Sequence, residues 1–169
     1  MDEISALIEP HIPSLRRYAW ALLRDRDAAD DLVQDCLERA LSRWQLRRRE
    51  GDLRAWLFAI LHNLFVDALR KRARQGIRVD IDAAHDLAAP GDDVEERATV
   101  RDVLGGLDAL PPDQKAVLLL VGVEDLSYEA AARVLGVPVG TVMSRLSRAR
   151  ERLRRAVGAP AAPVLRRVK

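Results

Sequence analysis

Cysteine, histidine and the other residues of catalytic sites are scarce in this chain of 169 residues. The one cysteine, Cys36, excludes an internal disulfide and a cysteine-based zinc site, and we interpret it as a small core residue. His11, His62 and His85 lack the spacing of metal ligands, and we expect His62 at the edge of a helix face. Phosphate-binding loops, dinucleotide-binding glycine turns and GxSxG nucleophile elbows are also missing. The sequence therefore predicts no catalytic residue, no metal, no cofactor and no enzymatic activity.

Long apolar runs and a signal peptide are missing as well. A membrane-spanning helix needs roughly 18 consecutive apolar residues, and no stretch approaches that length. We therefore expect a protein of the cytoplasm. Apolar residues recur at helical spacing along most of the chain, and no pair of alternating segments indicates strands. This pattern predicts an all-α fold.

The net charge of +2 hides an uneven distribution. Residues 76–112 carry 3 basic and 9 acidic side chains, whereas residues 113–169 carry 11 basic and 5 acidic ones. Residues 76–95 also lose helical periodicity and contain proline and glycine, as is typical of a flexible linker. We expect a helical domain on each side of this acidic linker and a disordered tail at 159–169. The basic end suggests contact with phosphate.

Two helices joined by a sharp turn are predicted within this basic end. Ser127 is a good N-cap for a helix over residues 128–135, and Gly136 suits the position that ends it. Pro138 suits the first turn of the next helix. A helix, a short glycine turn and a second helix form a helix-turn-helix motif, which binds the major groove of DNA in many proteins.

The second helix of this motif separates its residues by face. An apolar stripe is formed by Val142, Leu146, Ala149 and Leu153, and a neighbouring basic stripe by Arg145, Arg148, Arg152 and Arg155. Such a helix can pack through the first stripe and offer guanidinium groups, with the hydroxyls of Ser144 and Ser147, to DNA. A basic run by itself would favour a solvated surface helix, and DNA binding is favoured only by the capped helix, the glycine turn and the second helix together.

Three helices are predicted in the N-terminal part, over residues 13–24, 28–43 and 53–74, after a short lead-in at 1–11. The second carries five acids before its first basic residue: Asp27, Asp30, Asp31, Asp35 and Glu38. These acids are either a solvated face or a docking surface for a basic partner protein. The third ends in a basic cluster of Arg70, Lys71, Arg72 and Arg74, which suits a helix C-terminus and equally a nucleic-acid backbone.

Five short motifs together resemble the extracytoplasmic-function (ECF) sigma factors of bacterial RNA polymerase. They are DDLVQD at 30–35, LRAWLF at 53–58, LPPDQ at 110–114, LSYEAA at 126–131 and VGTV at 139–142. The resemblance covers nearly the whole chain. It implies a sigma-2 domain at 1–75, a linker at 76–95, a sigma-4 domain at 96–158 and a tail at 159–169. It also implies a factor that directs polymerase to promoters in a stress response.

The resemblance assigns roles to residues in three regions. Docking on the clamp helices of the polymerase β′ subunit is implied for Asp30, Asp31, Gln34, Asp35 and Glu38. Opening and reading of the −10 element is implied for Asn63, Asp67, Arg70, Lys71, Arg72 and Arg74. Recognition of the −35 element is implied for Thr141, Met143, Ser144, Arg145, Ser147 and Arg148. Asp67 and Met143 depart from the asparagine and the basic residue that are common in the family.

The implied partners are RNA polymerase core, through its β′ and β subunits, promoter DNA, and an anti-sigma factor, which in this family is often membrane-bound. No small-molecule substrate is implied. Two other functions fit parts of the sequence. A stand-alone helix-turn-helix regulator would bind its operator without polymerase, and an adaptor would use its helices only for protein contacts. Neither explains the acidic helix and the basic helices together.

Overall fold

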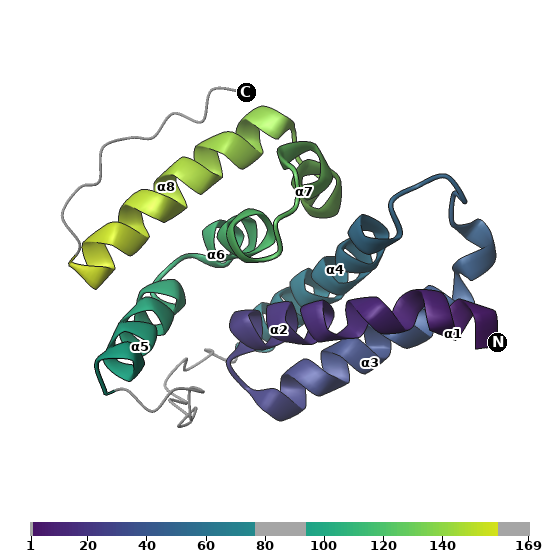
Figure 1. Cartoon of the computed structure of the whole chain (residues 1–169), viewed down its shortest axis with the longest axis horizontal. Coiled ribbons are helices and arrows are strands. Elements are labelled where there is room, and N and C mark those ends of the chain that lie inside the picture. The colour runs from purple at the N-terminus through teal and green to yellow at the C-terminus, as the bar shows by residue number, and fades with distance from the viewer. Residues whose placement is uncertain (1, 77–93, 159–169) are drawn as a thin grey trace.

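The computed structural model describes residues 2–76 and 94–158, without the side chains of 94–99. All regular elements in these residues are helical (Figure 1), which confirms the all-α prediction. None of the described helices has the length and apolar character needed to cross a membrane. The expected linker, apart from its ends, and the expected tail lie outside the described residues.

The N-terminal domain is built on three long helices. Its elements are α1 (Asp2–Ile8), η1 (Glu9–His11), α2 (Ile12–Leu23), α3 (Arg26–Ser42), η2 (Trp44–Leu46) and α4 (Leu53–Arg74). Aspartates begin two of the long helices, because Asp25 accepts a hydrogen bond from Ala28 N–H and Asp52 accepts one from Ala55 N–H. The expected lead-in is helical: Ile4 and Ile8 lie one turn apart and pack on the core.

The core of this domain lies between α2, α3 and α4. Leu15, Cys36 and Leu57 are fully buried, and the Cys36 thiol donates a weak hydrogen bond to the Leu57 carbonyl at 3.5 Å. Cys36 is therefore the core residue that we expected. Helical spacing also places Leu41 and Ala68 on the apolar faces of their helices, but Leu41 is 40% exposed and Ala68 is exposed.

The C-terminal domain consists of shorter helices and one long basic helix. They are α5 (Val94–Asp108), α6 (Pro112–Leu118), the π-helical turn η3 (Leu119–Val123), α7 (Tyr128–Leu135) and α8 (Val139–Val157). The helical winding therefore changes after Leu118. In the π turn, Glu124 N–H donates to the Leu119 carbonyl five residues back, at 2.9 Å. This wider turn ends the helix and redirects the chain.

The helix-turn-helix motif has the local geometry that the sequence predicted. Ala130 N–H donates to Ser127 Oγ at 3.1 Å, and Gly136 adopts a left-handed φ of 65° that ends α7. Pro138 differs from the expectation, because its extended ψ of 151° makes it the N-cap of α8 rather than a residue of the first turn. The apolar stripe of α8 is buried against the other helices, with Leu153 half-buried.

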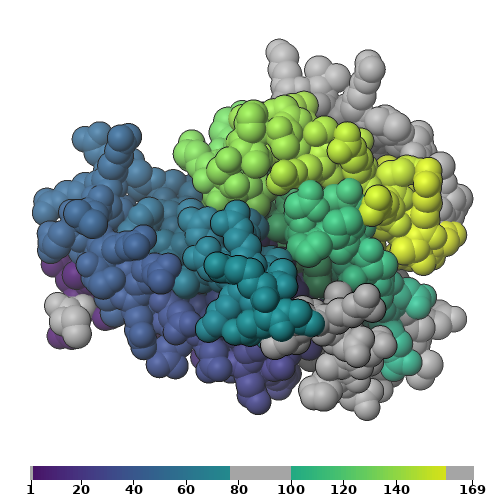
Figure 2. All heavy atoms as spheres, turned by 180° about the vertical axis from the view of Figure 1, so that it is seen from behind, coloured from purple at the N-terminus to yellow at the C-terminus, as the bar shows by residue number. Residues whose placement is uncertain are grey.

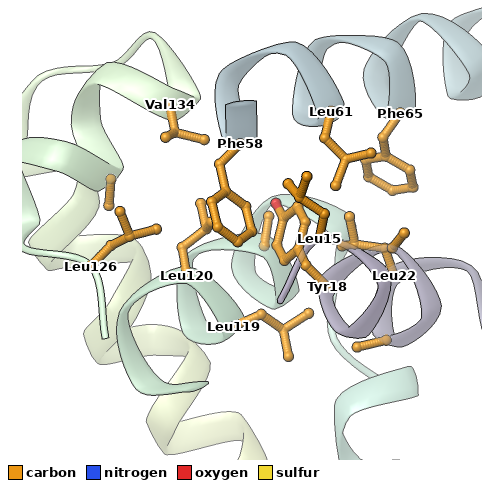
Figure 3. Packing of buried hydrophobic residues seen from close by; sticks show 14 of the residues in the cluster. Leu15, Tyr18, Leu22, Phe58, Leu61, Phe65, Leu119, Leu120, Leu126 and Val134 are labelled. Carbon is orange, nitrogen blue, oxygen red and sulfur yellow. The ribbon is translucent and has the colours of Figure 1, made fainter. Parts of the chain in front are cut away.

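The two domains share one hydrophobic core. In Figure 3, Phe58 from α4 points toward the side chains of the C-terminal domain, among them Leu120, Leu126 and Val134. Phe58 is fully buried and meets Tyr18 edge-on, with ring centroids 5.4 Å apart. The helical spacing of apolar residues in α4 did not single out Phe58, because several of its partners lie in the other domain, far away in sequence.

Candidate protein and nucleic-acid interfaces

The acidic residues of α3 form an exposed face. Asp30, Asp31, Gln34, Asp35 and Glu38 are all exposed and lie on the side of α3 that faces away from the core. Asp30 lies 3.5 Å from Arg16 of α2, and Gln34 donates to Glu38 at 3.2 Å. Within the described residues, Asp31 and Asp35 have no ion-pair partner. These carboxylates are available to a basic partner.

Polar and basic residues follow one side of α4. Asn63, Asp67, Arg70 and Arg74 recur every three or four residues, and all four are exposed. Lys71 and Arg72 are also exposed and widen the basic end of the helix. The Asn63 amide can donate and accept hydrogen bonds, whereas ionised Asp67 can only accept, for example from a base amino group. This side of α4 can therefore contact bases near Asn63 and phosphates near its C-terminus.

Four of the six candidate residues on α8 share an open face. Met143, Ser144, Ser147 and Arg148 are exposed, and Met143 is 53% exposed, which is high for a large apolar side chain. Ser144 Oγ donates to the Thr141 carbonyl at 3.1 Å, so its hydroxyl is held close to the helix. This face carries hydroxyl, apolar and guanidinium groups, which together can contact base edges.

Thr141 and Arg145 are less accessible than the other candidates. Thr141 is half-buried at the start of α8. Arg145 lies 3.7 Å from Asp113 of α6, and its side chain is 28% exposed. Arg145 therefore contributes to packing of α8 on α6, and the structure does not bring it fully to the open face.

The basic end of α4 and the helix α8 are visible on one side of the molecule. Figure 2 shows the C-terminal end of α4 in dark teal and α8 in light green to yellow, both reaching the surface. Two separate helices, one from each domain, thus offer basic surface to solvent. The acidic face of α3 belongs to the same domain as α4.

His62 and Tyr18 form a buried polar pair beside this surface. Tyr18 Oη and His62 Nδ1 are 3.0 Å apart, and His62 is 7% exposed rather than at a helix edge as expected. Burial, with Arg145 as a smaller cause, lowers the pKa of His62 to about 4. Burial also raises the pKa of Cys36 to about 12. Neither His62 nor Cys36 belongs to a metal site, because the described residues contain no cluster of three or more His, Cys, Asp or Glu suited to a metal ion.

Both domains match known protein families. Residues 8–62 match the Sigma2 domain of PhyR, and residues 101–153 match Sigma-70, region 4. Over 143 residues the chain is 43% identical to the ECF RNA polymerase sigma factor EcfG of Rhodopseudomonas palustris, covering 84% of this chain and 78% of that protein. It is 31% identical over 147 residues to the sigma factor SigV of Bacillus subtilis, covering 87% and 86% of the two chains.

The chain is an ECF sigma factor of the sigma-70 family. It directs the initiation of transcription and is not an enzyme. The prediction from the five sequence motifs is therefore confirmed.

Solved structures with the same fold include two protein complexes. The sigma factor RpoE in complex with the anti-sigma factor NepR from Bartonella quintana is 32% identical, with a TM-score of 0.82 over 95% of this chain and 100% of that one. CnrH in complex with the cytosolic domain of CnrY is 25% identical, with a TM-score of 0.69 over 93% and 88%. The high coverage of the first match includes both domains of this sigma factor.

Sequence reasoning missed the polar contacts between the two domains of the sigma factor. Glu124, at the end of the π turn, binds Arg17 of α2 and Arg54 of α4. These partners are 107 and 70 residues away in sequence, so no local spacing relates them. Asp108 at the end of α5 likewise pairs with Arg24 of the N-terminal domain. Such contacts depend on how the two domains are arranged in three dimensions, which the sequence pattern does not give.

Proposed function

We propose that the acidic face of α3 docks on the clamp helices of the polymerase β′ subunit. Support comes from the exposure of all five predicted residues and from the absence of an ion-pair partner for Asp31 and Asp35 in the described part of the chain. A basic partner would supply the missing counter-charges. The domain at 1–75 would then carry polymerase binding, and the domain at 96–158 would contact the β subunit.

We further propose that α4 and α8 read different promoter elements. On α4, Asn63 and Asp67 contact bases of the −10 element while Arg70, Lys71, Arg72 and Arg74 hold the backbone. On α8, the open face of Met143, Ser144, Ser147 and Arg148 enters the major groove at the −35 element, with Thr141 and Arg145 supporting its edge. Because each face is small, joint attachment to polymerase raises the effective concentration of the second contact once the first has formed.

Regulation by an anti-sigma factor in a stress response is the third part of the proposal. Two solved relatives of matching fold are complexes with the anti-sigma factor NepR and with the cytosolic domain of CnrY. The similarity to the first extends over both domains, which supports an anti-sigma factor as the regulator here. This sigma factor acts in the cytoplasm, where it meets polymerase core and promoter DNA.

The observation that carries the proposal is the exposure of three polar faces on helices that otherwise form one core. A pull-down with polymerase core tests the first face. Asp31→Lys with Asp35→Lys should weaken core binding at least tenfold, because it places positive charge against a basic partner. The matched control is Asp2→Lys with Glu3→Lys, which makes the same charge change on exposed residues of α1. Equal affinity of the two variants would contradict the assignment.

The contribution of Met143 is tested by promoter selection. An exposed thioether side chain in the groove favours an apolar contact, such as one to a thymine methyl group. Met143→Arg should change the preferred −35 sequence toward a guanine, which arginine recognises through two acceptors. If both proteins selected the same −35 sequence, Met143 would not contact the bases of this element.

A further inference from the structure

Glu124 is buried at the boundary between the two domains. Its side chain is 1% exposed. Arg17 donates from Nε to Oε1 and from Nη2 to Oε2, both at 2.8 Å, and Arg54 Nη2 donates to Oε2 at 3.2 Å. The carboxylate belongs to the C-terminal domain and both guanidinium groups belong to the N-terminal domain. The hydrogen bond to Glu124 raises the pKa of Arg17. Within the described residues, the charge of Glu124 is therefore balanced across the boundary.

A second ionic cluster crosses the same boundary with the same polarity. Asp108 Oδ2 lies 3.2 Å from Arg24 Nε, and Asp108 Oδ1 lies 3.1 Å from Lys115 Nζ. Arg24 follows α2 in a left-handed conformation with φ of 54°, an uncommon conformation for arginine. Again the acid comes from the C-terminal domain and the arginine from the N-terminal domain. One repeated arrangement of charges thus joins α2 and α4 to the other domain.

The ionic contacts between the domains favour one relative orientation, and they can also be broken. Apolar contacts such as those of Phe58 are non-directional, whereas a carboxylate held by two guanidinium groups has one geometry. A buried ion pair adds little net stability, because its charges are well hydrated when separated, but removing one partner leaves a buried charge unpaired and is strongly destabilising. Arg17 and Arg54 already retain solvent contact, with 53% and 32% of their side chains exposed. The boundary is therefore specific and can also be opened.

In the closed arrangement, the protein is smaller than the distance between the two promoter elements. The position numbers −10 and −35 differ by 25, which corresponds to about 85 Å of DNA at about 3.4 Å per base pair. A folded body of about 150 residues has a radius of gyration near 15 Å and is roughly 40 Å across. If α4 and α8 read the two elements, as proposed above, the domains must separate before both faces can bind.

We propose that Glu124 and Asp108, with Arg17, Arg54 and Arg24, form a latch that holds the free sigma factor closed and is released on binding to polymerase. The latch is a property of this chain itself and needs no inhibitor. It lowers the population able to bind core, so the apparent affinity for core falls in proportion to that population. A regulator that binds both domains would act by adding to the latch.

The test measures the distance between the domains in the free, full-length chain. Spin labels on Ser42→Cys and Ser147→Cys report it by double electron–electron resonance; both sites are exposed and lie in different domains, and the buried Cys36 stays unlabelled. Glu124→Gln keeps the side-chain shape and removes the charge. The population at long distance should rise on the order of tenfold, because a charged hydrogen-bonded contact is lost. Arg17→Gln with Arg54→Gln removes the partners of Glu124 in the N-terminal domain and should also raise the population at long distance. Asp108→Asn should raise it as well.

Arg16→Gln is the matched control. Arg16 lies beside Arg17 on α2, but it pairs with Asp30 of its own domain, and both side chains are more than half exposed. This variant should keep the closed distance distribution of the wild type. The proposal is overturned if Glu124→Gln and the double arginine variant also keep it, or if Arg16→Gln opens the chain equally.

Binding to polymerase core separates this proposal from the proposed function. Glu124→Gln should bind core with an affinity higher by about the factor by which the open population rises. An open Glu124→Gln chain with unchanged core affinity would overturn the regulatory role of the latch. If no form of the chain bound core, the proposed docking face would fail, while the distance measurement would still decide whether the latch exists.

Discussion

The two helices proposed to contact DNA differ in how they are buried. On α8, one apolar stripe of Val142, Leu146 and Ala149 is buried, and the rest of the helix carries six arginines. On α4, buried residues face two directions: Leu57 and Leu61 lie in the N-terminal core, while Phe58 points toward the other domain (Figure 3). The first helix thus has one partner, the rest of its own domain, whereas the second has two, its own domain and the C-terminal domain.

This difference explains why one helix is easy to interpret from sequence and the other is not. A helix with one partner shows a clean helical period of apolar residues. A helix with two partners carries apolar residues over a wider arc. Its apolar residues therefore no longer recur only at the spacing of a single helix face. Broad apolar coverage on a helix with a polar end therefore indicates a second partner, which for α4 is the C-terminal domain.

The largest expected effect comes from Phe58, which belongs to both interfaces of α4. Phe58→Ala should lower the free energy of unfolding by about 3–5 kcal/mol, the range for a fully buried phenylalanine. Urea unfolding followed by circular dichroism measures this loss. Leu46→Ala is the control, because Leu46 is 82% exposed, and it should change stability by less than about 0.5 kcal/mol. If the two variants were equally stable, Phe58 would not contribute to the core that the two domains share.

The second effect concerns His62 of α4, which is buried and whose pKa is lowered by burial and, less, by Arg145 of α8. Its pKa is lowered from 6.5 to about 4 in the folded state, so the unfolded chain binds more protons between these values. Stability from this group is fully present above pH 6.5 and decreases as the pH falls toward 4. The maximum loss is about 3 kcal/mol.

His62→Phe tests this pH dependence, because phenylalanine removes the titrating ring. The variant should lose less stability than the wild type between pH 6.5 and 4, whatever its absolute stability at neutral pH. Urea midpoints at a series of pH values give the two slopes. Since the carboxylates titrate in both proteins, their contribution cancels in the comparison. Parallel slopes would show that His62 is not kept neutral by burial.

A third effect separates two arginines of α8. We expect Arg148→Ala to weaken −35 recognition by about 1–3 kcal/mol, the range of a bidentate contact between arginine and a base. Arg145→Ala should affect recognition less, because Arg145 lies 3.7 Å from Asp113 and is already engaged with α6. Competition between promoters with altered −35 elements measures both. A larger loss for Arg145→Ala would reverse the assignment of the open face.

The smallest effect concerns the cap that begins the helix-turn-helix motif. Ser127→Ala removes the acceptor of Ala130 N–H and should destabilise the chain by about 1 kcal/mol. Ser127→Asp retains an acceptor and should restore most of the loss. Thermal unfolding of the three proteins provides the measurement. A stable alanine variant would mean that water replaces the cap without loss.

Local features of the fold were predictable because their causes are local. Ser127 and Gly136 mark the ends of α7 through their own side chain and backbone freedom, and the apolar stripe of α8 follows from helical spacing. The helix over Leu53–Arg74 was predicted with the bounds that the structure has. The exposed candidates on α3, α4 and α8 could be placed on their helices for the same reason.

Features between distant segments were not predictable. The partners of Glu124 lie 107 and 70 residues away, and His62 is buried by Tyr18 and by a second domain. The π turn at Leu119–Val123 has no glycine or proline at its start to mark it in the sequence. In each case the deciding contact comes from chain packing rather than from neighbouring residues.

Run-off transcription with altered promoters tests most directly whether α4 and α8 read separate elements. Wild type, Asn63→Ala and Arg148→Ala are each combined with polymerase core and with promoters changed at −10 or at −35. Asn63→Ala should lose sensitivity to the −10 changes and keep its sensitivity to the −35 changes, and Arg148→Ala should show the reverse. If both variants lost sensitivity at the same element, or if neither lost any, the division of promoter reading between the two helices would be wrong.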